Sequence, residues 1–341
     1  MKLFLYIFFL FLSSTIEAQK SDFKYINFEK ADSIANLYKG ERLCNLPLLA
    51  YKLSNNLNTQ VEKFRAIHTW VCSNIESDHG FSEKTIRKRK KFKNDSIAFS
   101  NWNTQVEAWV FDRLLKDKKT ICSGYAYLLK ELASLADIEC VIVNGYSRTV
   151  NTNVEAIDIP NHSWNAVKLN NKWYLVDATL ASGYFYINEN IFVKNYNDGY
   201  FLASPELFSK NHYPLDKKWL LLNDTLTINE FVKAPLIYGT TYKFGVMPIL
   251  PEKLVTQISV HEEVLFSLKT SYNMETDKIC LFINKGFKNE KIKVLNPEDK
   301  NNHKFKYRFS KKGNYDVHIK INNDVVVSYT IIVAKPKKSI L

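Results

Sequence analysis

Hydrophobic residues in the first part of the chain recur at steps of three and four, the spacing that places side chains on one face of a helix. The repeat runs through residues 22–75 and predicts helices there. A second amphipathic pattern predicts a helix over residues 103–115. A third begins after residue 121 and predicts a buried helix whose first turn carries Cys122.

The period changes to two after residue 139, which predicts strands. Residues 140–146 (CVIVNGY) are typical of a buried strand, and residues 163–169 and 172–176 flank the pair Asn170-Asn171. Such a pair is typical of a two-residue hairpin turn. With that turn, two residues face each other across the hairpin when their numbers add up to 341, so Asp177 faces Trp164. His162 is two residues from Trp164, which makes His162 and Asp177 diagonal neighbours on one face of the hairpin. A slip of one residue would send them to opposite faces.

The last third of the chain predicts a separate strand-rich region. Short apolar runs separated by turn residues span residues 254–260, 264–268, 279–283, 304–309, 315–321 and 325–333. Strands at this spacing suggest a β-sandwich, and the segment KGNY at residues 312–315 resembles the late hairpin of immunoglobulin-like modules. We predict an α+β fold with three parts: a leader at residues 1–18, a catalytic domain at 19–223 and a β-rich module at 224–341.

The N-terminus predicts export. Met1 and Lys2 precede an apolar run over residues 3–12, and a small, polar stretch then leads to Ala18. This order is that of a secretory signal peptide with cleavage after Ala18, and the run is too short to span a membrane. We therefore expect a secreted or periplasmic protein without a later transmembrane segment. The alternative is an uncleaved N-terminal anchor.

Composition supports a folded and basic protein. The 341 residues are 46% hydrophobic and 24% charged, with a formal net charge of +12. Residues 84–93 (KTIRKRKKFK) contain seven Lys or Arg residues. Such a like-charge run predicts a solvated loop, and the alternative is a surface for an anionic partner: nucleic acid, acidic glycan or lipid headgroups. No specific nucleic-acid motif is visible.

The five cysteines raise the question of which thiol is free. An oxidising compartment favours disulfides, but an odd number leaves one thiol over unless it pairs between chains. Cys72, Cys140 and Cys280 lie in apolar patterns and are expected in the core, whereas the position of Cys44 is uninformative. Cysteine and histidine spacings do not fit a metal site, and no calcium-loop or nucleotide motif is visible, so we predict no metal and no cofactor.

Cys122 has the sequence context of a reactive thiol. A helix N-terminus stabilises a thiolate, and the small residues Ser123 and Gly124 are expected to let a substrate chain approach. His162 follows as a base and Asp177 as the group that orients it, which predicts a Cys-His-Asp triad. Taken alone, a histidine in a strand is more often a hydrogen-bonded polar residue without a catalytic role, and an aspartate at a strand end is more often a turn or helix-cap residue. The other histidines lack such a partner by sequence; His212, for example, is placed in a proline-containing loop.

At these residues the chain resembles the transglutaminase-like superfamily of papain-like folds, and most closely its kyphoscoliosis-peptidase branch. The resemblance rests on residues 66–78 (AIHTWVCSNIESD), 120–140 (TICSGYAYLLKELASLADIEC), 161–183 (NHSWNAVKLNNKWYLVDATLASG) and 200–222 (YFLASPELFSKNHYPLDKKWLLL). It implies Cys122 as nucleophile, His162 as general base and acid, and Asp177 as orienting carboxylate. The chain departs from the family pattern at Thr120, where glycine is usual, and at Leu180, where tryptophan is usual.

The resemblance implies acyl transfer through a thioacyl enzyme on a protein or peptide-like polymer. The oxyanion would be held by the Cys122 backbone N–H and a second donor, for which Gln105 and Trp109 are guesses. Water as the acceptor gives a peptidase or amidase, and an amine gives a transglutaminase. The alternatives are an inactive protein-binding module on the same fold, or a small-molecule acetyltransferase or glycan amidase with the same triad.

Overall fold

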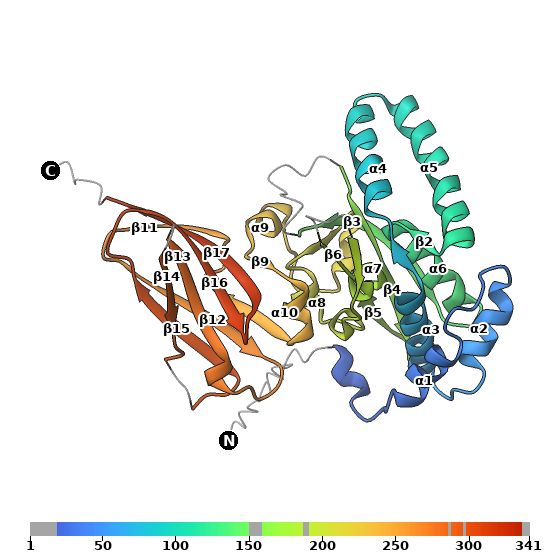
Figure 1. The fold of residues 1–341 in the computed structure, drawn as a ribbon, viewed down its shortest axis with the longest axis horizontal. Coiled ribbons are helices and arrows are strands. Elements are labelled where there is room, and N and C mark those ends of the chain that lie inside the picture. Colours follow the sequence, from blue (N-terminus) through green and yellow to red (C-terminus); the bar gives the residue numbers. More distant parts are fainter. Residues whose placement is uncertain (1–18, 150–158, 187–190, 286–287, 296–297, 336–341) are drawn as a thin grey trace, which may run out of the picture.

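A computed structural model describes residues 19–149, 159–186, 191–285, 288–295 and 298–335. The predicted leader at residues 1–18 lies outside the described residues. Figure 1 shows a helix-rich N-terminal part in blue to yellow and a strand-rich C-terminal part in orange to red. Within the described residues, the structure contains no helix with the length and apolar character needed to cross a membrane.

The N-terminal part is built from helices packed on one small sheet. Its helices are α1 (Glu29–Leu37), α2 (Leu46–Ser54), α3 (Gln60–Asn74), α4 (His79–Phe92), α5 (Ser96–Asp117) and α6 (Cys122–Ser134). Helix α6 is buried along its apolar face, where it packs on α3 and on strands β3 and β4. Its predicted place in the core, with Cys122 in the first turn, is confirmed.

The sheet has the order β5-β4-β3-β8 and is antiparallel throughout. Its strands are β3 (Cys140–Ser147), β4 (His162–Leu169), β5 (Lys172–Val176) and β8 (His212–Pro214). Asn170 and Asn171 have φ angles of 49° and 64°, which matches a two-residue turn in the left-handed region. Pairs such as Leu169 with Lys172 confirm the predicted register. Beyond Val176 the pairing ends, because Asp177 starts the short helix α7 (Ala178–Ser182).

The basic segment at residues 84–93 is helical, so the predicted loop is wrong. It lies in α4, which forms an antiparallel hairpin with α5 at the top of Figure 1. Phe81 and Thr85 are buried on α4, and Phe81 packs against Trp102 and Val106 of α5. Asp78 caps α4, since its carboxylate accepts the Phe81 N–H at 2.9 Å. This burial and capping outweigh the repulsion among exposed basic side chains.

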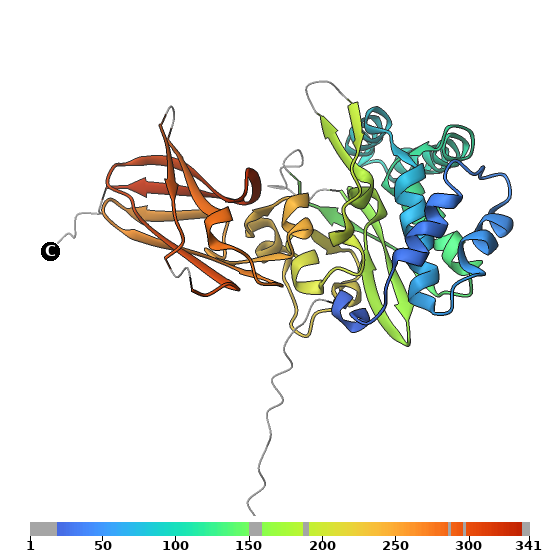
Figure 2. The ribbon, with the colours of Figure 1, turned by 60° about the horizontal axis from the view of Figure 1, so that its bottom comes forward.

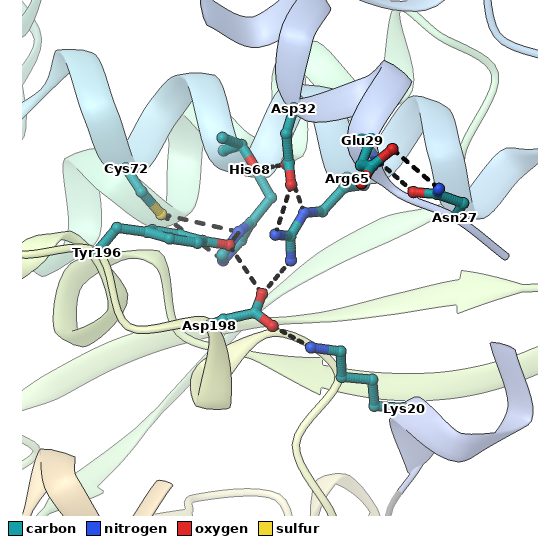
Figure 3. Close-up of polar contacts among 10 residues, drawn as sticks. Lys20, Asn27, Glu29, Asp32, Arg65, His68, Cys72, Tyr196 and Asp198 are labelled. Atoms are coloured by element: carbon teal, nitrogen blue, oxygen red, sulfur yellow. Dashed lines mark hydrogen bonds and ion pairs between the residues drawn. The ribbon is translucent and has the colours of Figure 1, made fainter. Parts of the chain in front are cut away.

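A buried arginine fastens the first helices to a turn after the sheet. Arg65 on α3 pairs with both carboxylate oxygens of Asp32 on α1, at 2.7 and 2.9 Å, and also contacts Asp198 (Figure 3). Asp198 begins η2 (Asp198–Tyr200) and pairs with Lys20 as well. Arg65 is only 6% exposed, so its buried charge depends on these two carboxylates for its balance. The carbonyl of Tyr200, in the same turn, accepts the N–H of Asp177 at 3.3 Å.

Further short elements lie between the helices of the N-terminal part or between its sheet and the C-terminal part. They are β1 (Glu76–Ser77), β2 (Lys119–Thr120), β6 (Gly183–Tyr186), β7 (Ile191–Lys194), α8 (Pro205–Phe208), η3 (Lys217–Leu220), α9 (Ile228–Lys233), β9 (Leu236–Ile237) and α10 (Gly239–Lys243). Helix α9 stays with the N-terminal part, because Arg148 donates to the carbonyls of Phe231 and Ala234 at 2.8 Å each. The predicted boundary between residues 223 and 224 stays a prediction.

The C-terminal part consists of two packed sheets. One has the order β10-β12-β15, and the other β11-β17-β16-β13-β14 with β9 beside β17. The strands are β10 (Val246–Leu250), β11 (Val255–Ser259), β12 (Glu263–Thr270), β13 (Ile279–Lys285), β14 (Lys288–Ile292), β15 (Asn302–Arg308), β16 (Gly313–Ile321) and β17 (Asp324–Ala334). Figure 2 shows them as layers at the left. Phe266 of one sheet meets Tyr329 of the other, with ring centroids 5.5 Å apart. The predicted strand-rich region with a helix-and-sheet domain before it is confirmed.

Candidate active site

Cys122, His162 and Asp177 come together from three elements. Cys122 is the first residue of α6, His162 the first of β4, and Asp177 the cap of α7. Nε2 of His162 lies 2.6 Å from Oδ2 of Asp177, and the His162 ring is close enough to the Cys122 sulfur to lower the pKa of the thiol. Because Nε2 faces the carboxylate, Nδ1 is the nitrogen that remains for the sulfur.

The local sequence explains this placement. Asn165, three residues after His162, donates its amide to the carbonyl of Ala126 at 2.9 Å and so ties β4 to α6. Ile121, directly before Cys122, is buried in the small core at the base of the α4–α5 hairpin. Asp177 uses Oδ1 to accept the Leu180 N–H at 2.9 Å. It therefore caps the helix and contacts a histidine at once, so its role as a cap does not exclude the predicted orienting role.

The electrostatics favour a charged sulfur–imidazole pair. Burial opposes the thiolate, but the hydrogen bond and charge of His162, the Ser163 backbone N–H and the charge of Arg89 lower the pKa of Cys122. Burial also opposes the imidazolium, but Asp177 and the Cys122 sulfur outweigh it and raise the pKa of His162 to about 10. Both shifts favour the thiolate–imidazolium pair over the neutral pair.

Asp177 stays ionised although it is completely buried. Burial alone would raise the pKa of this carboxyl, but His162 and His212 together hold it below the ordinary value. His212 lies with Nε2 3.0 Å from the same Oδ2 atom. The expectation that no other histidine has such a partner is therefore wrong, as is the loop assigned to His212, which begins strand β8.

A second cysteine–histidine pair lies on α3 and is unsuited to nucleophilic chemistry. The sulfur of Cys72 lies 3.7 Å from Nε2 of His68, and both side chains are buried (Figure 3). Burial raises the pKa of Cys72 well above the ordinary value. Burial, with the charge of Arg65, lowers the pKa of His68 to about 3. This pair is neutral, and its cysteine is a core residue, as predicted.

The five cysteines form no disulfide, so the expected pairing is not found. Cys72, Cys140 and Cys280 are buried, as predicted, and Cys44 is exposed. Burial raises the pKa of Cys140 to about 12 despite its contact with Asn165. Cys122 thus differs from the buried thiols because it alone has an imidazolium partner among the described cysteines.

Two small residues beside Cys122 have different neighbours. Ser123 is partly exposed, but Gly124 is buried. A Cβ atom at Gly124 would lie 1.9 Å from Oγ1 of Thr120. Gly124 therefore makes room for Thr120, the residue that departs from the family pattern, and the expectation that Gly124 admits a substrate chain is wrong. The other departure, Leu180, is partly buried and packs against the main core.

The guesses for a second oxyanion donor find no support in the contacts. Gln105 and Trp109 are exposed on α5, and Trp109 packs its ring on Trp102 and under Lys84. The second donor stays unassigned. A cavity of about 1220 Å³ lies elsewhere, between the two parts of the chain, and its lining includes Tyr242 and Lys210 but none of the three candidate catalytic residues.

His162, Asp177 and His212 could in principle hold a metal ion, because their ligand atoms lie within 4.8 Å of one another. Both Nε2 atoms, however, face one carboxylate oxygen at 2.6 and 3.0 Å. These are hydrogen-bond distances, and the ring nitrogens do not point at a shared vacant position. The three side chains fit a hydrogen-bonded cluster better than a metal centre.

Residues 48–178 match the family model of the transglutaminase-like superfamily. The chain therefore carries a transglutaminase-like domain, as the sequence predicted. It is 31% identical over 227 residues to the kyphoscoliosis peptidases of Homo sapiens and Mus musculus, over 66% of this chain and 31% of each relative. Hillarin of Drosophila melanogaster is 27% identical over 234 residues, over 64% of this chain and 26% of its own length. The predicted resemblance to the kyphoscoliosis-peptidase branch is confirmed, although the chain spans less than a third of these relatives.

Proposed function

We propose that this protein is a cysteine-dependent acyl-transfer enzyme that acts on a protein or peptide-like polymer. The observation that supports this most directly is the position of His162 between Cys122 and Asp177, with the pKa of the thiol lowered and that of the imidazole raised. A non-catalytic binding module has no need for a charged sulfur at a helix N-terminus.

The proposed cycle needs only groups of this site. The thiolate of Cys122 attacks an amide carbonyl, and a C–S bond forms as the carbonyl π electrons move to oxygen. The Cys122 backbone N–H helps to hold this oxyanion. His162 then gives its Nδ1 proton to the leaving amine, and a thioacyl enzyme remains. Water or a second amine attacks it, His162 accepts the displaced proton, and the thiolate leaves.

Reactivity toward iodoacetamide tests the proposal without a known substrate. Because His162 lowers the pKa of Cys122, we expect Cys122 to be labelled at neutral pH at least about tenfold faster than an ordinary thiol. In the His162→Ala variant the rate at pH 7 should fall about tenfold, and the pH midpoint of labelling should rise toward that of a free cysteine. Peptide mass spectrometry measures both.

Cys44 is an internal reference for this experiment, because it is an exposed thiol on the same chain. Labelling of Cys122 no faster than Cys44 at pH 7 would refute the enzymatic proposal and leave the binding module. Product analysis with casein-like and cell-wall peptides, with and without an added amine, then separates hydrolysis from crosslinking.

Export and an acidic partner belong to the same proposal. The leader-like N-terminus supports a protein that works in the periplasm or outside the cell.

The exposed residues Lys84, Arg87, Lys90 and Lys91 follow one side of α4, and we name them the basic face. In the described part of the chain none of these four pairs with a carboxylate. Arg89 of the same helix acts electrostatically on Cys122, so an acidic polypeptide held there would lie near the thiol.

Charge reversal tests the basic face. The variant Lys84→Glu, Arg87→Glu, Lys91→Glu should bind fluorescent poly-glutamate about tenfold more weakly and with a smaller salt dependence, because screened contacts are lost. Fluorescence anisotropy at two salt concentrations measures this. The control reverses three exposed lysines of the β-rich part, Lys304, Lys306 and Lys311. Equal weakening in both variants, or preference of the native chain for anionic vesicles or RNA, would contradict an acidic polypeptide.

A further inference from the structure

The carboxylate of Asp177 has a second imidazole partner whose role is not explained by a three-residue site. His212 and Asp177 are both fully buried, and Nε2 of His212 lies 3.0 Å from Oδ2 of Asp177. The same oxygen faces Nε2 of His162 at 2.6 Å. The two rings lie on strands that flank β3, with centroids 5.6 Å apart.

The fold holds the His212 ring firmly. Phe208 stacks on one side at a centroid distance of 3.8 Å and an angle of 15° between the planes, and Trp164 meets the ring edge-on at 5.1 Å. Trp164 fits here because Gly145 on β3 has no side chain; a Cβ atom would lie 2.7 Å from the indole ring. Nδ1 of His212 lies 2.8 Å from Oδ1 of the Asn211 side chain. Packing and hydrogen bonds therefore fix the ring from several sides.

His212 is neutral, since burial lowers its pKa more than Asp177 raises it. A neutral ring has one N–H, and the carboxylate is the strongest acceptor that it meets, so that proton belongs on Nε2. Nδ1 is then an acceptor, and it pairs with Asn211 only when the amide is turned so that its NH2 group takes the position of Oδ1 beside the ring. The hydroxyl of Tyr242 contacts the same amide atom, and with the amide turned it accepts from the NH2 group and donates its proton to the carbonyl of Leu207 at 3.3 Å.

Asp177 is fully buried and receives three hydrogen bonds: from His162 and His212 on Oδ2, and from the Leu180 N–H on Oδ1. Each bond stabilises the ionised carboxylate in a place where water cannot. Other titratable groups that feel the charge of Asp177 come from four more elements: Tyr125 on α6, Cys72 and His68 on α3, Tyr200 on η2 and Tyr242 on α10. None of these donates to the carboxylate among the described contacts.

We propose that His212 is a positioning residue of the active site: its Nε2–H holds Asp177 ionised and fixes Oδ2 where it orients His162. The inference rests on the proposed acyl-transfer function for its effect on catalysis, but its effect on the Cys122–His162 pair can be measured without a substrate. His212 acts through Asp177 and does not touch the reacting sulfur.

Two variants of the full-length protein separate the hydrogen bond from the packing. His212→Phe keeps a ring against Phe208 but removes the donor, and His212→Gln keeps an N–H at the reach of Nε2. Loss of a charge-assisted hydrogen bond costs about 10–100-fold in the equilibrium that it supports. We expect His212→Phe to raise the pH midpoint of Cys122 alkylation by about one unit and to lower kcat on p-nitrophenyl acetate about tenfold with KM unchanged. His212→Gln should stay within about threefold of the native protein.

The control is His303→Phe, the same substitution at a completely buried histidine in the β-rich part. It should leave the alkylation midpoint unchanged. Ring ¹⁵N NMR of His162 reports its protonation directly in each variant. A native midpoint in His212→Phe, or equal shifts in the Phe and Gln variants, would overturn the inference. A chain that shows the shifts but turns over no ester or peptide would instead overturn the proposed function, so the two failures are distinguishable.

Discussion

The Cys122→Ala variant is expected to lose acyl transfer at least about 10³-fold, because the thioacyl intermediate cannot form without the sulfur. With p-nitrophenyl acetate, the native protein should release a burst of p-nitrophenolate and carry an acetyl group on Cys122 in peptide mass spectra. The variant should show neither. Its fold should persist, since Cys122 is only partly buried and lies outside the hydrophobic clusters.

Cys140→Ala is the matched control. The Cys140 thiol is buried, and its pKa is raised to about 12, so it contributes no nucleophile at neutral pH. The variant should keep the burst and the acetylation of Cys122. A burst that survives in Cys122→Ala would show that the nucleophile lies elsewhere in the chain.

The Asp177→Asn variant is expected to lower kcat about 10⁴-fold, the size of effect that the equivalent change has in serine protease triads. An amide cannot neutralise the His162 imidazolium, and its NH2 group would face the ring N–H of one of two histidines. The pKa of His162 should therefore fall from its raised value, and the alkylation midpoint of Cys122 should rise. Stopped-flow ester hydrolysis and pH-dependent labelling measure the two effects.

Asp95→Asn provides the comparison, because Asp95 also caps a helix through its side chain, with the Ala98 N–H at 2.9 Å. Asparagine caps helices as well as aspartate does, so this change should leave activity and labelling at native values. If Asp177→Asn loses no more activity than Asp95→Asn, then Asp177 serves only as the cap of α7.

The candidate site could be predicted from sequence because its parts are local. A helix start at Cys122 follows from hydrophobic periodicity, and the two asparagines at the hairpin turn set the register that brings His162 and Asp177 to one face. Neither step needs knowledge of how distant segments pack. The structure places these residues together, and their catalytic roles stay a prediction.

His212 was missed because its partner depends on sheet order. Strand β8 pairs with β3, which lies 65 residues or more before it, and sequence pattern does not indicate which strand lies beside which. The residue was visible inside the last segment that resembles the family, directly before Tyr213 and Pro214. Only the fold shows that this segment returns to the edge of the sheet and brings an imidazole to Asp177.

The basic helix was missed for a different reason. Seven like charges in ten residues argued against regular structure, but Phe81, Thr85 and Phe92 recur at helical spacing through the same segment. Their burial against α5 is a tertiary effect that overrides local repulsion. The expectation that Gly124 admits a substrate chain was also wrong because of tertiary packing. The neighbour that leaves no room for a side chain at Gly124 is Thr120 and not a ligand.

The absence of any cystine has a practical consequence for making and handling the protein. Because none of the five cysteines is crosslinked, reaching the native state requires no oxidant, and reductant breaks no covalent bond within it. A bacterial cytosol is therefore a suitable host for recombinant production. On storage in air, Cys44 is the exposed thiol through which two molecules would join, and its replacement by serine gives a preparation that resists such dimers.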